Sequence, residues 1–73
     1  MEITLNGQRR DVPDALTVAG LLGILELKPE HVAVEVNRGL VTRDRHEGTP
    51  IAPGDEVEIV AQGGGGSPAA AES

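Results

Sequence analysis

Polar and apolar residues alternate with a period of two near both ends of the chain, with a helical spacing between them. Ile3 and Leu5 stand between polar neighbours, the pattern of a half-buried strand, and Asn6-Gly7 is the strongest short-range signal for a β-hairpin. We therefore predict a first strand that ends at this turn and a second strand over residues 8–12.

One helix is predicted next. Thr17 stands at the expected N-cap, where its hydroxyl can accept a hydrogen bond from a backbone N–H of the first turn. Four apolar residues follow with the spacing of one helix face: Val18, Leu21, Leu22 and Leu25. Pro29 is expected to end the helix, since proline disrupts a helix interior.

The second half of the chain predicts three more strands. Valines alternate with other residues over 32–37, which is the clearest strand, and Asn37-Arg38-Gly39 reads as a turn into a short strand over 40–42. Residues 43–50 are charged and predicted to be irregular, and Pro53-Gly54-Asp55 is a further turn.

The last predicted strand covers residues 56–61, with Val57 and Ile59 on its inner face. Its outward residues are Glu56, Glu58 and Val60. The order of elements predicts an α+β domain of two layers over residues 1–62, in which the helix crosses one face of the sheet.

Composition narrows the range of functions. The 73 residues include no Phe, Tyr, Trp or Cys, so we expect a thin aliphatic core, no enclosed substrate pocket and no thiol chemistry. A net charge of -6 argues against nucleic acid as a partner and favours a basic protein surface. No stretch has the roughly 20 apolar residues of a membrane span or the pattern of a signal peptide, so we expect a cytoplasmic protein that does not bind membranes.

Several segments, in their order and spacing, carry a resemblance to a known family. They are Ile3-x-Leu5-Asn6-Gly7, Thr17-Val18, Leu21-Leu22, Ala33-Val34-Glu35-Val36-Asn37, Val41, Arg43, Gly54-Asp55-x-Val57-Glu58-Ile59-Val60 and the final glycines. Over residues 1–66 the sequence resembles the ThiS family, the ubiquitin-like sulfur carriers of thiamine biosynthesis. This resemblance implies a β-grasp fold, a five-stranded mixed sheet whose first and last strands are parallel neighbours.

The resemblance also implies a chemistry. Family members end in Gly-Gly, which falls at Gly65-Gly66 within the glycine run 63–66. A ThiF-like enzyme would adenylate the carboxylate of Gly66 with ATP, and sulfide from a sulfur donor such as a cysteine desulfurase would convert it to a thiocarboxylate. A ThiG-like thiazole synthase would then take the sulfur. On this interpretation the protein is a cosubstrate, not an enzyme, and carries no cofactor or metal.

Glycine suits such a position because it lacks Cβ and lets the backbone enter a narrow channel. Fully extended, the chain from Ala61 to Gly66 spans about 20 Å at 3.3 to 3.6 Å per residue. The domain surface would have to supply the docking energy. We predict a docking patch on the outer face around Val60, beside Glu56 and Glu58.

The segment from Ser67 to Ser73 departs from the family pattern, because it holds Gly66 in a peptide bond. We expect a peptidase to remove it on maturation, as zinc metallopeptidases often do for ubiquitin-like proteins. Two alternatives stay open: this copy has lost carrier function, or the segment was added artificially. Its composition predicts disorder.

The remaining basic residues have simpler explanations. Arg38, Arg43 and Arg45 are interpreted as solvated loop charges in preference to anion contacts. His31 and His46 lack neighbouring ligands, so we expect both to be exposed and without a metal role. His46 stands where the family commonly has an aromatic residue, often tryptophan.

Three other functions stay open. A ubiquitin-like binding module, in which the glycines are only a linker, would tolerate changes at Gly66. A related sulfur carrier would serve molybdopterin, cysteine or tRNA thiolation, although Asn6-Gly7 and the segment 34–37 favour the thiamine family. A modifier conjugated to other proteins would form few chains, since Lys28 is the single lysine.

Overall fold

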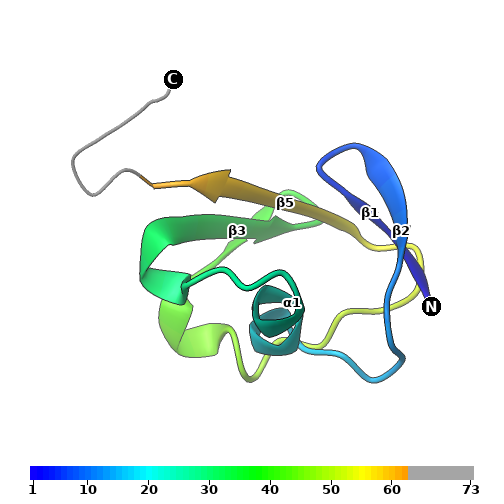
Figure 1. The fold of residues 1–73 in the computed structure, drawn as a ribbon, viewed down its shortest axis with the longest axis horizontal. Helices are drawn as coiled ribbons and strands as arrows, with labels where there is room; N and C mark the ends of the chain where they lie inside the picture. Colours follow the sequence, from blue (N-terminus) through cyan, green and yellow to red (C-terminus); the bar gives the residue numbers. More distant parts are fainter. Residues whose placement is uncertain (63–73) are drawn as a thin grey trace.

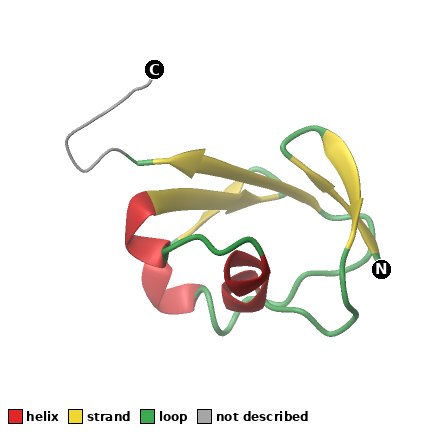
Figure 2. Ribbon diagram, in the orientation of Figure 1, coloured by secondary structure: helices red, strands yellow, loops and turns green. Residues whose placement is uncertain are grey.

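Five strands form one mixed sheet, and an α-helix packs across one of its faces (Figures 1 and 2). This computed structural model describes residues 1–62, so the predictions for residues 63–73, Gly65 and Gly66 included, lie outside the described residues. In chain order the elements are β1 (Glu2–Leu5), β2 (Gln8–Asp11), α1 (Val18–Ile24), the 3₁₀ turn η1 (Pro29–His31), β3 (Val32–Val36), β4 (Gly39–Val41), the 3₁₀ turn η2 (Arg43–Arg45) and β5 (Glu56–Ala61).

The last strand lies in the middle of the sheet. The strand order is β2-β1-β5-β3-β4, and β5 runs parallel to β1 and antiparallel to β3. Leu5 of β1 stands opposite Val57 of β5. This arrangement confirms the β-grasp fold, with the first and last strands as parallel neighbours (Figure 1).

Both hairpin turns form where they were predicted. Asn6 and Gly7 have φ values of 51° and 82°, and Asn37 and Arg38 have 51° and 71°. Two-residue hairpins need this left-handed backbone because its twist matches that of the flanking strands. β2 ends one residue before the predicted limit and β4 is shifted by one, while β3 and β5 contain the predicted alternation.

The helix begins as predicted but ends earlier. The hydroxyl of Thr17 accepts a hydrogen bond from the backbone N–H of Gly20 at 3.1 Å, which caps the first turn. The prediction that Pro29 ends the helix is wrong, because α1 stops at Ile24. Glu26 has a φ of 58° and its N–H donates to the carbonyl of Gly23, while the N–H of Leu27 donates to that of Leu22, a Schellman motif.

The core lies between α1 and the inner face of the sheet and is entirely aliphatic apart from one histidine. Its most buried side chains come from four elements: Ile3, Val18, Leu21, Leu22, Val34 and Val57. On α1 the core residues are three or four positions apart, and on the strands they are two positions apart. The helical and the strand periodicity of the sequence therefore each place one apolar face against the other.

The segment predicted to be irregular, residues 43–50, is tied to the start of α1. It begins with η2, and the N–H groups of Val18 and Ala19 donate to the carbonyls of Thr49 and His46 at 3.0 Å each. These bonds use helix N–H groups that have no partner within the helix. The loop therefore belongs to the helical layer, although it contains no regular strand.

Candidate functional site

The structure describes the place from which the glycine run departs. β5 ends at Ala61, which stands opposite Val32 of β3. Gln62 follows, and its N–H donates to the carbonyl of His31 at 2.8 Å. The chain is therefore held to β3 and η1 up to Gln62, at the end of the sheet away from Met1 (Figure 1).

The three residues predicted for docking share one side of β5. Glu56, Glu58 and Val60 alternate with the inward residues and are all exposed, Val60 by 58%. They therefore stand on the face of the sheet that α1 leaves uncovered, and the outward orientation predicted for them is confirmed.

Register extends this surface across two more strands. Ala33 stands opposite Val60, and Glu35 stands between Glu58 on β5 and Leu40 on β4. Residues directly opposite in a sheet project from the same face. Together with Glu56, these residues form a surface that we call the outer-face patch: Ala33, Glu35, Leu40, Glu56, Glu58 and Val60.

Ala33, Glu35 and Leu40 belong to the outer-face patch but were not predicted for docking, and Leu40 is the large apolar residue among them. It is 66% exposed, the highest value among the exposed large hydrophobic residues of the described chain. The signal was present, because Val41 next to it is apolar, and in a strand only one of two successive residues can face the core. Val41 is buried and Leu40 points outward.

The outer-face patch also contains a like-charge pair. Glu35 and Glu58 stand directly opposite each other on neighbouring antiparallel strands, where two like charges repel. Within residues 1–62, the ion pairs involve Met1 and the Arg9–Glu2 pair, and neither glutamate takes part in one. A cationic side chain placed over this pair would be attracted by both carboxylates.

His46 lies in the core, so the prediction that it is exposed is wrong. It is 3% exposed, and its Nε2 lies 3.2 Å from the carbonyl oxygen of Val41, a contact in which the ring N–H donates. Its Nδ1 is buried without a hydrogen-bond partner in the described residues. The backbone carbonyl of His46 also accepts the hydrogen bond from the N–H of Ala19, so this residue joins the end of η2 to the start of α1. His31, in contrast, is exposed as predicted.

Asp55 has a structural role. Its carboxylate accepts hydrogen bonds from the backbone N–H of Ala52 at 2.8 Å and from the side-chain amide of Asn37 at 3.1 Å. The Asn37 side chain in turn accepts a hydrogen bond from the N–H of Glu56 at 3.0 Å. These contacts join the turn before β5 to the hairpin between β3 and β4.

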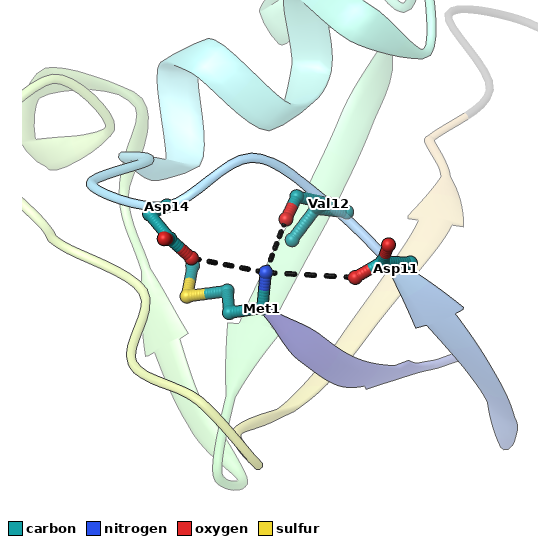
Figure 3. A network of polar contacts seen from close by, with 4 residues as sticks. All are labelled: Met1, Asp11, Val12 and Asp14. Atoms are coloured by element: carbon teal, nitrogen blue, oxygen red, sulfur yellow. Dashed lines mark hydrogen bonds and ion pairs between the residues drawn. The ribbon is translucent and has the colours of Figure 1, made fainter.

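A polar network at the far end of the sheet holds the α-amine of Met1 (Figure 3). The amine donates to the carbonyl of Val12 at 2.6 Å and lies 3.0 Å from the carboxylate of Asp14 and 3.5 Å from that of Asp11. The hydrogen bond to Asp14 is the largest cause that raises the pKa of the amine above its ordinary value of 8.0. The network fastens β1 to the segment after β2 and has no contact with the outer-face patch.

Two other kinds of site were considered for the described residues. Residues 1–62 contain no group of three or more His, Asp or Glu side chains arranged to hold a metal ion. In the same part of the chain no helix has the length and apolar character needed to cross a lipid bilayer. The features that stand out are the outer-face patch and the departure point of the glycine run.

Comparison with known proteins agrees with this geometry. The model of the ThiS family matches residues 3–66. A crystal structure of the thiamine biosynthesis protein ThiS from Geobacter metallireducens superimposes with a TM-score of 0.79 at 35% identity, covering 90% of this chain and 100% of that one.

Two curated relatives are much longer proteins. The thiazole synthase of Paramagnetospirillum magneticum is 39% identical over 67 residues, which is 92% of this chain and 21% of that protein. The thiazole synthase of Magnetococcus marinus is 37% identical over 73 residues, 100% of this chain and 22% of that protein. The chain thus spans about a fifth of the length of these two relatives.

Proposed function

This chain belongs to the ThiS family, and on that basis we propose that it is a sulfur carrier of thiamine biosynthesis whose reactive group is the carboxylate of Gly66. The observation that carries the proposal is the extent of the family match, which ends at residue 66, the last of the four glycines. The protein acts as a cosubstrate, and the catalytic groups belong to its partners.

The reaction begins with activation of a poor electrophile. A ThiF-like enzyme transfers AMP from ATP to the Gly66 carboxylate and releases pyrophosphate. Sulfide, supplied as such or released by a thiol reductant from the persulfide of a cysteine desulfurase, attacks the carbonyl carbon, and AMP leaves with the bonding electrons. The product is a thiocarboxylate, from which a thiazole synthase takes the sulfur. The two thiazole synthases that contain a segment similar to this chain support that choice of acceptor.

The outer-face patch serves as the docking surface of the carrier. Val60 exposes apolar area on β5, the strand that leads to the glycines, Leu40 does so on β4, and Glu35 and Glu58 supply charge between them. A partner surface that places basic side chains over the two glutamates and apolar side chains over Leu40 and Val60 complements both features. The repulsion between the two glutamates is relieved when a basic side chain comes between them.

Maturation precedes activation. Seven residues, Ser67 to Ser73, follow Gly66, and a peptidase has to remove them before the glycine has a free carboxylate. A metallopeptidase of the kind that trims other ubiquitin-like proteins is the proposed agent. The thiazole synthase of Magnetococcus marinus aligns with all 73 residues, so a sequence that continues past the glycines also occurs in a relative.

The test compares a protein ending at Gly66 with the 73-residue protein, each incubated with ATP, a ThiF-like enzyme and a sulfide source. Intact mass should rise by one oxygen-to-sulfur exchange in the shorter form only. Equal reactivity of the 73-residue form would refute the maturation step. Absence of the mass change in both forms would refute the carrier function, and transfer of the sulfur to molybdopterin synthesis in place of thiazole synthesis would reassign the pathway.

A further inference from the structure

The backbone hydrogen bond between Gln62 and His31 lies at the base of the glycine run. The N–H of Gln62 donates to the carbonyl oxygen of His31 at 2.8 Å, one residue beyond the end of β5. It continues the pairing of β5 with the segment before β3, since Ala61 already stands opposite Val32. We call this hydrogen bond the clasp.

The acceptor of the clasp, the carbonyl of His31, is fixed by the hydrogen bonds of the residues around it. Pro29 is the first residue of η1, where its fixed φ favours the turn and its missing N–H costs nothing. The N–H of His31 donates to the carbonyl of Lys28 at 2.9 Å, and the N–H of Val32 donates to that of Pro29. Val32 is buried and begins β3. The His31 carbonyl therefore has a fixed position relative to the sheet.

The clasp limits how far the reactive carboxylate can reach. Four residues, 63 to 66, follow Gln62 in the proposed mature form. Four residues span at most about 13 to 14 Å, at 3.3 to 3.6 Å per residue. The value of about 20 Å derived from the sequence is longer because it counts six residues, Ala61 and Gln62 included, at the same length per residue.

We propose that the clasp is a positioning device that fixes the origin of the glycine run and so sets how far Gly66 can reach into the partner's nucleotide site. This inference rests on the proposed carrier function. Opening the clasp would move the last fixed point back to Ala61 and add one residue, about 3.4 Å, to the reach. His31 and Gln62 act through the position of Gly66 and touch no reacting atom.

The clasp can be removed without changing its neighbours. It is formed by the backbone N–H of Gln62, and only proline lacks that group. Ala61 is already extended in β5, which is the conformation that a following proline requires. Gln62→Pro therefore opens the clasp, whereas Gln62→Ala changes the same side chain and keeps the clasp.

The experiment uses proteins that end in the glycine run and measures the rate of adenylation by the ThiF-like enzyme. Deleting Gly63 shortens the reach by one residue and should lower kcat by at least about tenfold, since a 1 Å misplacement can cost about a hundredfold. The KM for the carrier should stay the same, because the docking surface is intact. Adding Gln62→Pro to the deletion should recover activity to within about threefold of the unaltered protein, since the lost reach is restored.

The matched control is Gln62→Ala added to the same deletion, which should stay as slow as the deletion alone. A fast deletion variant would overturn the inference, and so would failure of Gln62→Pro to restore the rate. If the unaltered protein is not adenylated, this result refutes the proposed carrier function and does not bear on whether the clasp forms. The clasp has its own readout, because the Gln62 amide should exchange its hydrogen slowly, and exchange at the rate of an unstructured amide would refute it.

Discussion

The side-chain oxygen of Asn6 accepts a hydrogen bond from the backbone N–H of Ile59 at 2.8 Å. β1 has already ended at this point, and the N–H of Asn6 itself donates to the carbonyl of Val57 at 2.9 Å. The asparagine side chain thus takes the place of the next ladder bond while its backbone, with φ of 51°, turns into the hairpin. One residue performs both tasks.

Asn6→Ala is expected to lower the free energy of unfolding by about 1 to 2 kcal/mol, through the lost acceptor and the left-handed backbone that alanine disfavours. Asn6→Gly removes the acceptor and keeps the turn, so it should cost less. Urea denaturation of both variants separates the two contributions. Equal stability of Asn6→Ala and the unaltered protein would show that Asn6 does not support β5.

Leu40→Ser is expected to weaken binding to the ThiF-like enzyme by at least about tenfold, because it removes the most exposed apolar side chain of the proposed docking surface. Stability should change little, since Leu40 is 66% exposed. Ile24→Ser on α1, a residue 46% exposed, is the matched control and should not affect binding. Calorimetric titration measures both, and equal losses would exclude the outer-face patch as the specific surface.

His46→Ala is expected to destabilise the protein by about 2 to 4 kcal/mol, because it leaves a cavity beneath η2. His31→Ala, at an exposed histidine, should change stability by less than about 0.5 kcal/mol. The midpoint of urea denaturation measures the difference. A small effect at both positions would mean that the loop collapses into the space of the imidazole.

Glu26→Gly is expected to raise the free energy of unfolding by about 0.5 to 1 kcal/mol, because Glu26 has a φ of 58° at the end of α1 and glycine adopts that backbone without strain. Gly54→Ala makes the opposite change. Gly54 has a φ of 83°, a backbone conformation that strains alanine, so this substitution should lower the free energy of unfolding. Thermal unfolding measures both changes. A loss of stability in Glu26→Gly would show that the glutamate side chain contributes more than its backbone strain costs.

Stability should also fall at alkaline pH through the α-amine of Met1. Its pKa is raised in the folded protein, so its contribution is fully present below pH 8.0 and is lost as the pH rises through the folded pKa. Asp14→Asn should reduce this dependence more than Asp11→Asn, since Asp14 is the nearer carboxylate. Unfolding temperatures measured from pH 7 to pH 10 test the order of the two variants.

Much of the fold follows from local patterns in the sequence. Some features depend on only a few neighbouring residues and were predicted correctly. They are the alternation over β3 and β5, the Asn6-Gly7 turn and the Thr17 cap. The parallel pairing of β1 with β5 joins residues far apart in the chain, and it was implied only by the family resemblance.

Each feature that the sequence did not predict has its own physical cause. Glu26 ends the helix with a backbone that glutamate rarely adopts, so nothing in its residue type signalled the end. His46 is buried because a loop folds over it, and loop packing leaves no periodic pattern. Leu40 was missed for a different reason, because its three-residue strand is too short for the alternation to stand out. The clasp is a backbone contact, which residue types cannot reveal.

The position of β5 has a consequence for the order in which the molecule can assemble. β1 with β2 and β3 with β4 are local hairpins, and the strand that joins them follows both in the chain. Its pairing with β1 closes a loop of about 50 residues, which costs more conformational entropy than closing either hairpin, so we expect it to form after them. Until that closure the two hairpins share no sheet. The strand that completes the sheet is also the one that leads directly to the glycines, so in the proposed carrier these residues have a fixed origin only once the sheet is complete.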